Sequence, residues 1–575
     1  MRELAQDVLP IAVLTVAAVL GGCATAIPDG PGLEAVPVFE GTPASPRPLP
    51  PKAVAPHPLL GTNSVFHDDH YNSDVSDFPA PLGLDPRVLS RFYLLCGTPR
   101  TDSRGRVITL CADWSNPGGT RLYLLDPDSL EALASIPFDG GGATGTQVGG
   151  GNYPHVTAED RVINGGPAGT LDVYEILDRG PRKPAWRLTR AADLSPWIEP
   201  GDALFDIAPD FDGLYWFATA HGRVGYLDPE SGGVRTLDLP GERVENGMAV
   251  GPHGVYVVTD AALYRFGLDP ADGAPAVVWR EPYAVDPDPK PGLFSRGSGS
   301  TPTLLGEELV AITDNAPGRV NLLVYRRAEA VPGDRLVCSV PLFDEGASGV
   351  DVSPIGYGDS LVVANWIGAP GPLDLPNDTS LPGFIGDYRA MPGGLIRVDV
   401  RSDRSGCDPV WELSGLRTTS VPKLSTATGL VYTLTQRIDA FTEAVDPPLD
   451  AWYLTAVDFR TGERVWDLLL GTGPYLHNGF LTPTIGPNGA LYQAVLGGIV
   501  KVSDGAAGPG YRARYHALQR WEAYRRYWAA RSRSYRLESV REEPIRRTDC
   551  TREQLLETIT GLFDLRAPAC GPRGS

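Results

Sequence analysis

The stretch Leu430–Asp504 decides the fold. It reads LVYTLTQR from residue 430, WYLTAVDFRTGERVWDLLLGTG from residue 452 and NGFLTPTIGPNGALYQAVLGGIVKVSDG from residue 478. Short β-branched and aromatic runs alternate with Gly, Pro, Asn and Asp, which is the pattern of short strands joined by tight turns. The order is strand, tight turn, strand, Asp-led turn and a strand that contains Trp466. This order predicts a repeating unit of short antiparallel strands.

The same order recurs from about residue 92 onward. Eight units can be laid out, at about 92–138, 150–190, 203–240, 245–283, 299–343, 348–413, 418–470 and 478–504. A period of about 40–60 residues with four strands per unit indicates a β-propeller. We therefore predict an all-β, eight-bladed propeller; seven blades are the alternative if the sixth or eighth unit is miscounted. The eighth unit lacks an outer strand, which in a closed ring would come from residues 60–95.

Two positions repeat within these units. The third strand ends in an Asp, whose carboxylate can accept hydrogen bonds from turn amides two residues on. The fourth strand carries a Trp in half of the units, and a large flat ring there is suited to fill the wedge between neighbouring blades. The Asp residues are Asp126, Asp228, Asp269, Asp399 and Asp458, and the Trp residues are Trp186, Trp279, Trp411 and Trp466.

The segment Tyr453–Trp466, YLTAVDFRTGERVW, resembles the repeat of pyrroloquinoline-quinone-type propellers. That repeat has the approximate pattern Leu-Tyr-Ala-Leu-Asp, two residues, Thr-Gly, a short gap and Trp. The resemblance covers about 400 residues as an architecture, but only this stretch as a sharp motif. It implies an eight-bladed, quinoprotein-like propeller.

The N-terminus has the features of a targeting segment. Val8–Leu20 is nearly all apolar and too short to span a bilayer, but it suits the core of a signal peptide. Leu20-Gly21-Gly22-Cys23 resembles the lipobox of bacterial lipoproteins, which implies lipidation of Cys23. The n-region, with Arg2 beside Glu3 and Asp7, is hardly basic, so a mis-assigned start codon or an uncleaved anchor is the alternative. We expect a protein exported and lipid-anchored to the bacterial cell envelope, on its periplasmic or extracellular face.

Four regions follow from these signals. We predict a signal peptide and lipobox at 1–23, a Pro-rich tether at 24–60, the propeller at 61–505 and a helical tail at 506–575. Ten prolines between residues 24 and 60 favour a semi-rigid spacer. In the tail, residues 511–535 lack Gly and Pro and carry aromatic residues beside several arginines. That helix can face an anionic membrane or an acidic partner, or dock on its own acidic propeller.

Cysteine number and net charge limit the function further. Without Cys23, six cysteines remain, and an even number in an exported chain suggests disulfides. Neighbouring positions favour the pairs 96–111, 338–407 and 550–570. The net charge of −20 argues against nucleic-acid binding, since phosphate contacts need clustered Lys and Arg.

The polar run His67-Asp68-Asp69-His70-Tyr71-Asn72-Ser73-Asp74 is the first candidate site. Its carboxylates and imidazoles are ligands for Ca²⁺ or another divalent metal, with His67, Asp69, His70 and Asp74 as the candidate set. If the segment is extended, His67, Asp69 and Tyr71 share one side and Asp68, His70 and Asn72 the other, so only part of the set can bind one ion. The alternative is a solvated loop that leads into the propeller.

The second candidate site is a ring of polar residues that open the first strand of each unit, where a propeller places its central channel. These residues are His155, Asp206, Asn246, Thr301, Asp351, Lys423 and Asn478. Glu245-Asn246-Gly247-Met248 also resembles the Asn-Gly that precedes a strand in gluconolactonase-like, metal-dependent propellers. The alternative is that these groups satisfy one another and channel water.

Two functions are compatible with these features. The first is a binding or scaffold module that binds an envelope protein or glycan; a lipobox combined with a quinoprotein-like propeller resembles the outer-membrane assembly lipoprotein. The second is a metal-dependent hydrolase or an oxidoreductase with its site at the channel mouth. Quinoprotein dehydrogenases typically stack their cofactor on a disulfide of adjacent cysteines, and this chain has no adjacent cysteines, which argues against bound pyrroloquinoline quinone.

Overall fold

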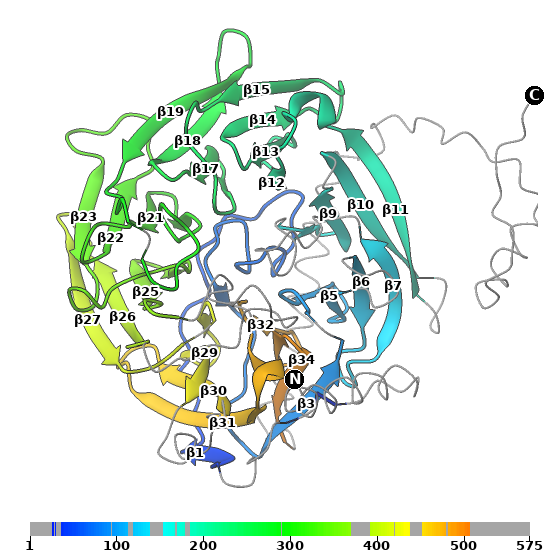
Figure 1. Cartoon of the computed structure of the whole chain (residues 1–575), viewed down its shortest axis with the longest axis vertical. Coiled ribbons are helices and arrows are strands. Elements are labelled where there is room, and N and C mark those ends of the chain that lie inside the picture. The colour runs from blue at the N-terminus through cyan, green and yellow to red at the C-terminus, as the bar shows by residue number, and fades with distance from the viewer. Residues whose placement is uncertain are drawn as a thin grey trace, which may run out of the picture.

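The structure is a computed structural model in which eight β-sheets form a closed ring (Figure 1). It describes residues 26–27, 29, 36–93, 95–112, 119–138, 153–166, 169–178, 184–288, 290–369, 391–418, 420–437, 451–478 and 481–505. The predicted signal peptide with Cys23, the predicted helical tail and the pair Cys550 and Cys570 lie outside these residues. Within the described residues, no helix is long and apolar enough to cross a membrane.

Each blade is a four-stranded antiparallel meander whose first strand lies innermost and whose last lies toward the rim, except that blade 8 takes its rim strand from the N-terminal region. The sheet of blade 7 has two further strands from that region, one at its outer edge and β2 (Val75–Ser76), parallel to β28, at its inner edge. Blades 1 and 2 are β4 (Arg100–Thr101), β5 (Val107–Ala112), β6 (Thr120–Leu125), β7 (Ala132–Phe138), β8 (His155–Val156), β9 (Arg161–Gly165), β10 (Thr170–Asp178) and β11 (Pro184–Asp193). Blades 3 and 4 are β12 (Leu204–Pro209), β13 (Tyr215–Thr219), β14 (Arg223–Leu227), β15 (Val234–Asp238), β16 (Ala249–Gly251), β17 (Gly254–Val258), β18 (Ala262–Leu268) and β19 (Pro275–Pro282).

The second half of the ring repeats this arrangement. Blades 5 and 6 are β20 (Thr303–Leu305), β21 (Leu309–Thr313), β22 (Asn321–Arg326), β23 (Leu336–Pro341), β24 (Ile355–Tyr357), β25 (Ser360–Ala364), β26 (Gly394–Val400) and β27 (Cys407–Ser414). Blades 7 and 8 contain β28 (Lys423–Ser425), β29 (Leu430–Arg437), β30 (Ala451–Asp458), β31 (Arg464–Thr472), β32 (Thr484–Ile485), β33 (Leu491–Val495) and β34 (Gly498–Asp504). Short 3₁₀ turns lie at Ser195–Trp197 and Pro474–Leu476. The eight-bladed prediction is confirmed, and the seven-bladed alternative is wrong.

An N-terminal strand closes the ring. Strand β3 (Pro86–Phe92) pairs antiparallel with β34 as the outer strand of blade 8. This pairing confirms the expectation that residues 60–95 supply the missing strand. Backbone hydrogen bonds between β3 and β34 therefore join the two ends of the propeller within blade 8.

The Pro-rich segment is packed against the propeller from residue 37 onward. Strand β1 (Phe39–Gly41) adds to the outer edge of blade 7 by pairing with β31. The amides of Arg47 and Leu49 then donate to the carbonyls of Thr428 and Thr426. This part of the chain therefore differs from the spacer that its proline content predicts, because backbone pairing and packing on the blades fix it.

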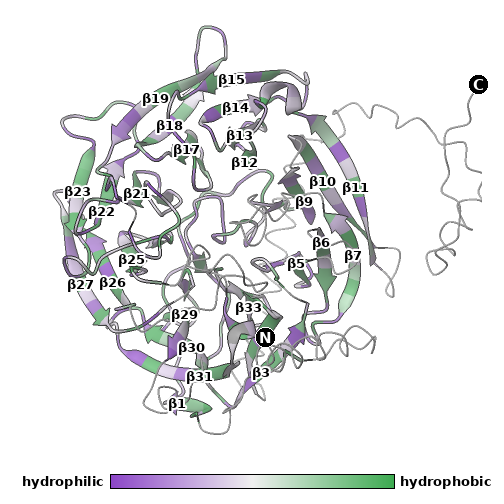
Figure 2. Cartoon of the chain, in the orientation of Figure 1, coloured by the Kyte–Doolittle hydropathy of each residue, from purple (hydrophilic) through white to green (hydrophobic). Residues whose placement is uncertain are grey.

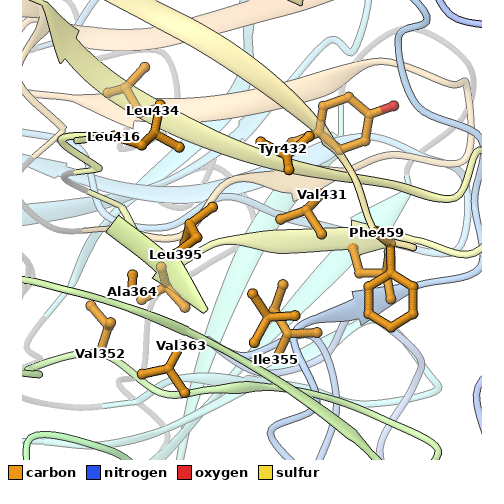
Figure 3. Close-up of a cluster of buried hydrophobic side chains, with 14 of the residues drawn as sticks. Val352, Ile355, Val363, Ala364, Leu395, Leu416, Val431, Tyr432, Leu434 and Phe459 are labelled. Carbon is orange, nitrogen blue, oxygen red and sulfur yellow. The ribbon is translucent and has the colours of Figure 1, made fainter. Parts of the chain in front are cut away.

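Apolar side chains fill the spaces between neighbouring blades. Figure 3 shows one such space, where Val363 and Leu395 of blade 6 lie in one cluster with Val431 and Tyr432 of blade 7. The rim strands, such as β15 and β27, carry more hydrophilic residues (Figure 2) and are partly exposed. Strands buried on both faces explain why the inner sequences read as continuous apolar runs.

The repeated Trp spans neighbouring blades. Trp411 of β27 donates from Nε1 to the carbonyl of Phe459 in blade 7, and Trp279 of β19 donates in the same way to the carbonyl of Arg327 in blade 5. These contacts confirm the wedge position that the sequence predicts for Trp279 and Trp411; no such bond to the next blade is present at Nε1 of Trp186 or Trp466 in the described residues.

Most of the predicted Asp turns are present. The carboxylates of Asp126, Asp228, Asp269 and Asp458 each accept the amide two residues on, at 2.8–3.0 Å. Asp399 is the exception, because its carboxylate bonds the guanidinium of Arg397, at 2.7 and 2.8 Å. A turn still follows this strand, but the prediction that Asp399 caps it is wrong.

Two disulfides are present, Cys96–Cys111 and Cys338–Cys407. Both pairs were expected from position. The second joins β27 of blade 6 to β23 of blade 5, so it fastens two neighbouring rim strands to each other.

Candidate functional site: a plugged central channel

A segment from the N-terminal region occupies the centre of the ring (Figure 1). Its carbonyls accept hydrogen bonds, at 2.7–3.0 Å, from the second residue of the inner strand of five blades. The carbonyls are those of Ser64, His70, Tyr71, Ser73 and Asp74, and the donors are the amides of Val156, Val250, Leu304, Gly356 and Leu424. We call residues 57–76 the plug.

The plug takes this path because its polar residues allow a looped backbone. Asn63, Asp68, Asn72 and Asp74 all have φ between 53° and 79°. Asn and Asp tolerate this left-handed region better than other non-glycine residues. The polar run is therefore coiled, which makes the alternating sides expected of an extended strand wrong.

Two buried lysines neutralise the carboxylates of the plug. Lys52 Nζ lies 2.7 Å from Asp68 Oδ2 and 2.6 Å from Asp69 Oδ2, and its side chain is 8% exposed. Lys423 Nζ, from β28, lies 3.0 Å from Asp74 Oδ1 and 3.7 Å from Asp68 Oδ1. These ammonium groups stand where a cation bound by Asp68, Asp69 or Asp74 would stand.

The candidate metal ligands therefore do not come together. His67 Nδ1 lies 2.8 Å from Asp74 Oδ2, and its Nε2 lies 3.3 Å from Ser353 Oγ. Asp69 accepts the Ser73 hydroxyl and two plug amides. No group of three His, Cys, Asp or Glu in the described residues has the geometry of a metal site. The structure does not fit the divalent metal expected at His67, Asp69, His70 and Asp74.

The surroundings of the plug determine the protonation states of Asp74 and His70. Burial alone would raise the pKa of Asp74, but Lys423 and His67 outweigh it and hold that pKa below its usual value. His70 lies against the rings of His57, Phe211 and Tyr71. Burial, together with the charges of Lys52 and Arg327, lowers the pKa of His70 to about 3. His70 is therefore neutral at physiological pH.

His155 and Asp206, from the inner strands of blades 2 and 3, are in contact. His155 Nε2 lies 2.9 Å from Asp206 Oδ1, and both residues are buried. Asp206 Oδ2 accepts the amide of Met248 at 2.8 Å, and His155 Nδ1 has no hydrogen-bond partner. Arg100 of blade 1 is also buried, which lowers its pKa to about 10 against the opposing attraction of Asp206.

A second group of ionisable residues surrounds Tyr153. Burial and the Asp206 carboxylate raise the pKa of Tyr153 to about 12. Burial also raises the pKa of Asp351, to about 6, and repulsion from Glu245 adds to this rise. Asp351 Oδ2 accepts the amide of Phe294 at 2.5 Å, and Glu245 Oε2 accepts two amides of the same loop, at residues 296 and 297. Two carboxyl groups with raised pKa values, Asp351 and Glu245, thus interact with each other, and Asp351 also interacts with the Tyr153 phenol.

The predicted ring is only partly one site. His155, Asp206 and Asp351 all act on Tyr153 or its neighbours. Asn246 donates to the carbonyl of Ser298, while the amide of Thr301 donates to the Ser353 hydroxyl. Lys423 pairs with Asp74 of the plug, and Asn478 donates to the carbonyl of Leu481. The contacts of Lys423 and Asn478 therefore stabilise the structure and do not involve Tyr153.

The sequence reading missed Lys52, His57, Arg100 and Tyr153. Lys52 and His57 lie in the segment assigned as a tether, where Lys52 is the only lysine before residue 183. Thr98-Pro99-Arg100, Tyr153-Pro154-His155 and Val421-Pro422-Lys423 share a proline before a polar residue of the inner strand. That repeated tripeptide is the signal that could have identified Arg100.

The fold and the channel define the class of this protein, an eight-bladed β-propeller whose centre is plugged by its own N-terminal segment. No protein-family model matches the chain. An uncharacterised protein from Archaeoglobus fulgidus is 27% identical over 334 residues, which are 54% of this chain and 62% of that protein. The match thus spans less than two thirds of that relative.

Similar solved structures are also propellers. Quinohemoprotein alcohol dehydrogenase from Comamonas testosteroni is 12% identical with a TM-score of 0.43, over 79% of this chain and 82% of that one. BamB from Moraxella catarrhalis is 14% identical with a TM-score of 0.33, over 60% of this chain and 93% of that one. A streptogramin B lyase is 10% identical with a TM-score of 0.31, over 73% of this chain and 97% of that one. These likenesses concern the fold alone.

Proposed function

We propose that this protein is a binding or scaffold module whose ligands meet the faces of the propeller rather than its channel. The observation that carries the proposal is the plug, whose five carbonyls bond five inner strands. Its carboxylates pair with Lys52 and Lys423, so the centre is occupied by the protein's own side chains. A segment that fills the channel in this way holds the inner strands of five blades together.

We place this module at the bacterial cell envelope, lipid-anchored through Cys23, with an envelope protein or glycan as its partner. The apolar run and the lipobox-like Leu20-Gly21-Gly22-Cys23 support the location. The disulfides Cys96–Cys111 and Cys338–Cys407 support export, because such bonds persist in oxidising compartments.

A propeller enzyme with its site around Tyr153 is the second candidate. Asp351 and Glu245 have raised pKa values, and His155 has a free Nδ1 beside Asp206. Groups whose pKa values are shifted toward neutrality are suited to proton transfer. This candidate requires a substrate that reaches Tyr153, and it makes Asp351 the acid or base.

Elemental analysis and a visible spectrum of residues 24–575, purified without chelator, test the two candidates together. A binding module is expected to be colourless, and to retain an envelope protein or glycan from membrane extract above a mock-column background. A stoichiometric metal, a quinone band, or the failure to retain any envelope component would contradict the first candidate. The second would then be tested through Asp351→Asn and His155→Gln.

A further inference from the structure

A pocket of about 560 Å³ lies between blades 4, 5 and 6. Its walls come from the β16–β17, β20–β21, β22–β23 and β26–β27 connections and from the strands beside them. Half of the residues that line the pocket are charged, namely three glutamates and the four arginines Arg265, Arg326, Arg327 and Arg404. In a chain with a net charge of −20, four arginines around one pocket stand out.

Three of these arginines have only neutral partners. Arg265 donates to the carbonyls of His253 and Arg327, at 2.5–3.2 Å. Arg326 donates to the carbonyls of residues 334 and 404, at 2.9 and 3.1 Å. Arg327 donates to the Tyr256 hydroxyl at 3.0 Å and to the carbonyl of residue 306 at 2.5 Å. Among the residues that the structure describes, none of the three has a carboxylate oxygen within 4.0 Å.

The equivalent arginine of another blade shows what is missing. Arg397 of blade 6 is opposite Trp411, as Arg265 of blade 4 is opposite Trp279. In each pair, the Nη1 of the arginine and the Nε1 of the Trp donate to one carbonyl of the next blade. Arg397 and its Trp share the carbonyl of residue 459, and Arg265 and its Trp share that of residue 327. Arg397 is also paired with Asp399, two residues on, at 2.7 Å. The corresponding residue after Arg265 is Gly267, so blade 4 lacks the counter-ion.

Arg327 is the most deeply buried of the three. It is 2% exposed, its guanidinium lies 5.3 Å and 5.1 Å from the ring centroids of Tyr71 and Tyr256, and its side chain also hydrogen-bonds the neutral side chain of Tyr71. A buried cation without a counter-ion is costly, and an anion that approaches it is stabilised by the low local dielectric.

The acidic residues limit the kind of anion. Glu308 is already paired with Arg404, at 3.0 Å. Glu307 and Glu329 line the same pocket and are exposed. Their charge repels an extended polyanion at the rim, while a single oxyanion can still reach the arginines.

We propose that this pocket binds one oxyanion group, a phosphate or a carboxylate, of a small ligand. The planar guanidinium groups of Arg326 and Arg265 retain N–H donors that no carbonyl occupies, and arginine binds such oxyanions in a bidentate way. The assignment goes beyond the proposed function and does not depend on it, because it needs no protein or glycan partner.

Titration calorimetry of the full chain with inorganic phosphate and with acetate, in low-salt buffer, tests the pocket. We expect saturable binding of one or both; the probe that binds more tightly identifies the source of the oxyanion. Arg326→Gln should weaken binding about tenfold or more, because it removes charged hydrogen bonds. Gly267→Asp should weaken it similarly, by giving Arg265 the counter-ion that Arg397 has.

Arg319→Gln is the matched control, since Arg319 donates to the carbonyl of Leu342 and lies outside the pocket. Binding to this variant should equal that of the native chain, and thermal unfolding should show that all variants are folded. The proposal is overturned if neither anion binds saturably, if both pocket variants bind as the native chain does, or if the control weakens as much as they do.

Discussion

Lys52 Nζ lies 2.6 Å from Asp69 Oδ2, and both side chains are almost completely buried. The pair joins the Pro-rich segment to the plug across 17 residues of chain. The same ammonium group also bonds Asp68 and the carbonyl of Val75. One lysine thus fixes the segment that leads to the centre of the propeller.

Replacing Lys52 by Met should destabilise the protein strongly. Asp68 and Asp69 would lose their buried counter-ion, and removing one partner of such a pair typically costs about 3–5 kcal/mol. The free energy of unfolding, measured by chemical denaturation, checks this. Lys501→Met is the control: Lys501 pairs with Asp128, which is 88% exposed, so a loss below about 1 kcal/mol is expected. Equal losses in the two variants would argue against the buried network.

His70 should make stability depend on pH. Its pKa is lowered to about 3 in the folded state, so below the unfolded value of about 6.5 the unfolded chain takes up a proton that the folded chain does not. The contribution is fully present above about pH 6.5 and is lost as pH falls toward 3, by about 1.4 kcal/mol per pH unit. Chemical denaturation at pH 7, 6 and 5 gives the free energy of unfolding at each pH. Its fall with decreasing pH should be smaller in His70→Gln than in the native chain by this amount. An unchanged slope would mean that His70 titrates normally in the folded protein.

The rim disulfide should contribute to stability. In the chain-entropy model, closing the 69 residues between Cys338 and Cys407 stabilises the fold by about 4 kcal/mol. The double variant Cys338→Ser, Cys407→Ser should therefore unfold at lower denaturant. The native chain measured under reducing conditions provides the comparison, although it also loses Cys96–Cys111. A double variant as stable as the oxidised native chain would show that blades 5 and 6 hold together without this bond.

Replacing Gly462 by Ala should destabilise the protein. The φ of Gly462 is +74°, and a Cβ would come within 2.6 Å of the Trp411 ring, which packs there from blade 6. Gly415 has a similar φ of +75° but open space around it. Both Ala variants pay for the backbone strain of about 1 kcal/mol, and Gly462→Ala should lose about 1–3 kcal/mol more through overpacking. Thermal unfolding of the two variants measures the difference, and equal losses would refute the wedge role of Trp411.

Much of the fold could be predicted because it depends on local sequence patterns. The Asp-led turn, the Trp position and the apolar strands repeat along the chain, and each depends on residues only a few positions apart. The closing strand β3 was also predictable, since a ring with one short blade needs a partner from the other end.

The centre of the molecule could not be predicted in the same way. The pairing of Asp74 with Lys423 joins residues 349 positions apart, and no local pattern indicates it. The inner strands also present their backbone amides to the plug, which a pattern of side chains does not reveal. The same holds for the metal hypothesis: the ligand types suit a cation, but in the described residues two lysines supply positive charge beside these carboxylates.

Hydrogen–deuterium exchange of residues 57–76 and of the inner strands tests the plug most directly. The amides of Val156, Val250, Leu304, Gly356 and Leu424 each donate to a plug carbonyl. Peptides that contain them, and the plug itself, should exchange as slowly as the buried strand β29. Exchange of the plug at the rate of an unprotected chain, with the inner strands opening alongside it, would contradict a propeller built around its own N-terminal segment.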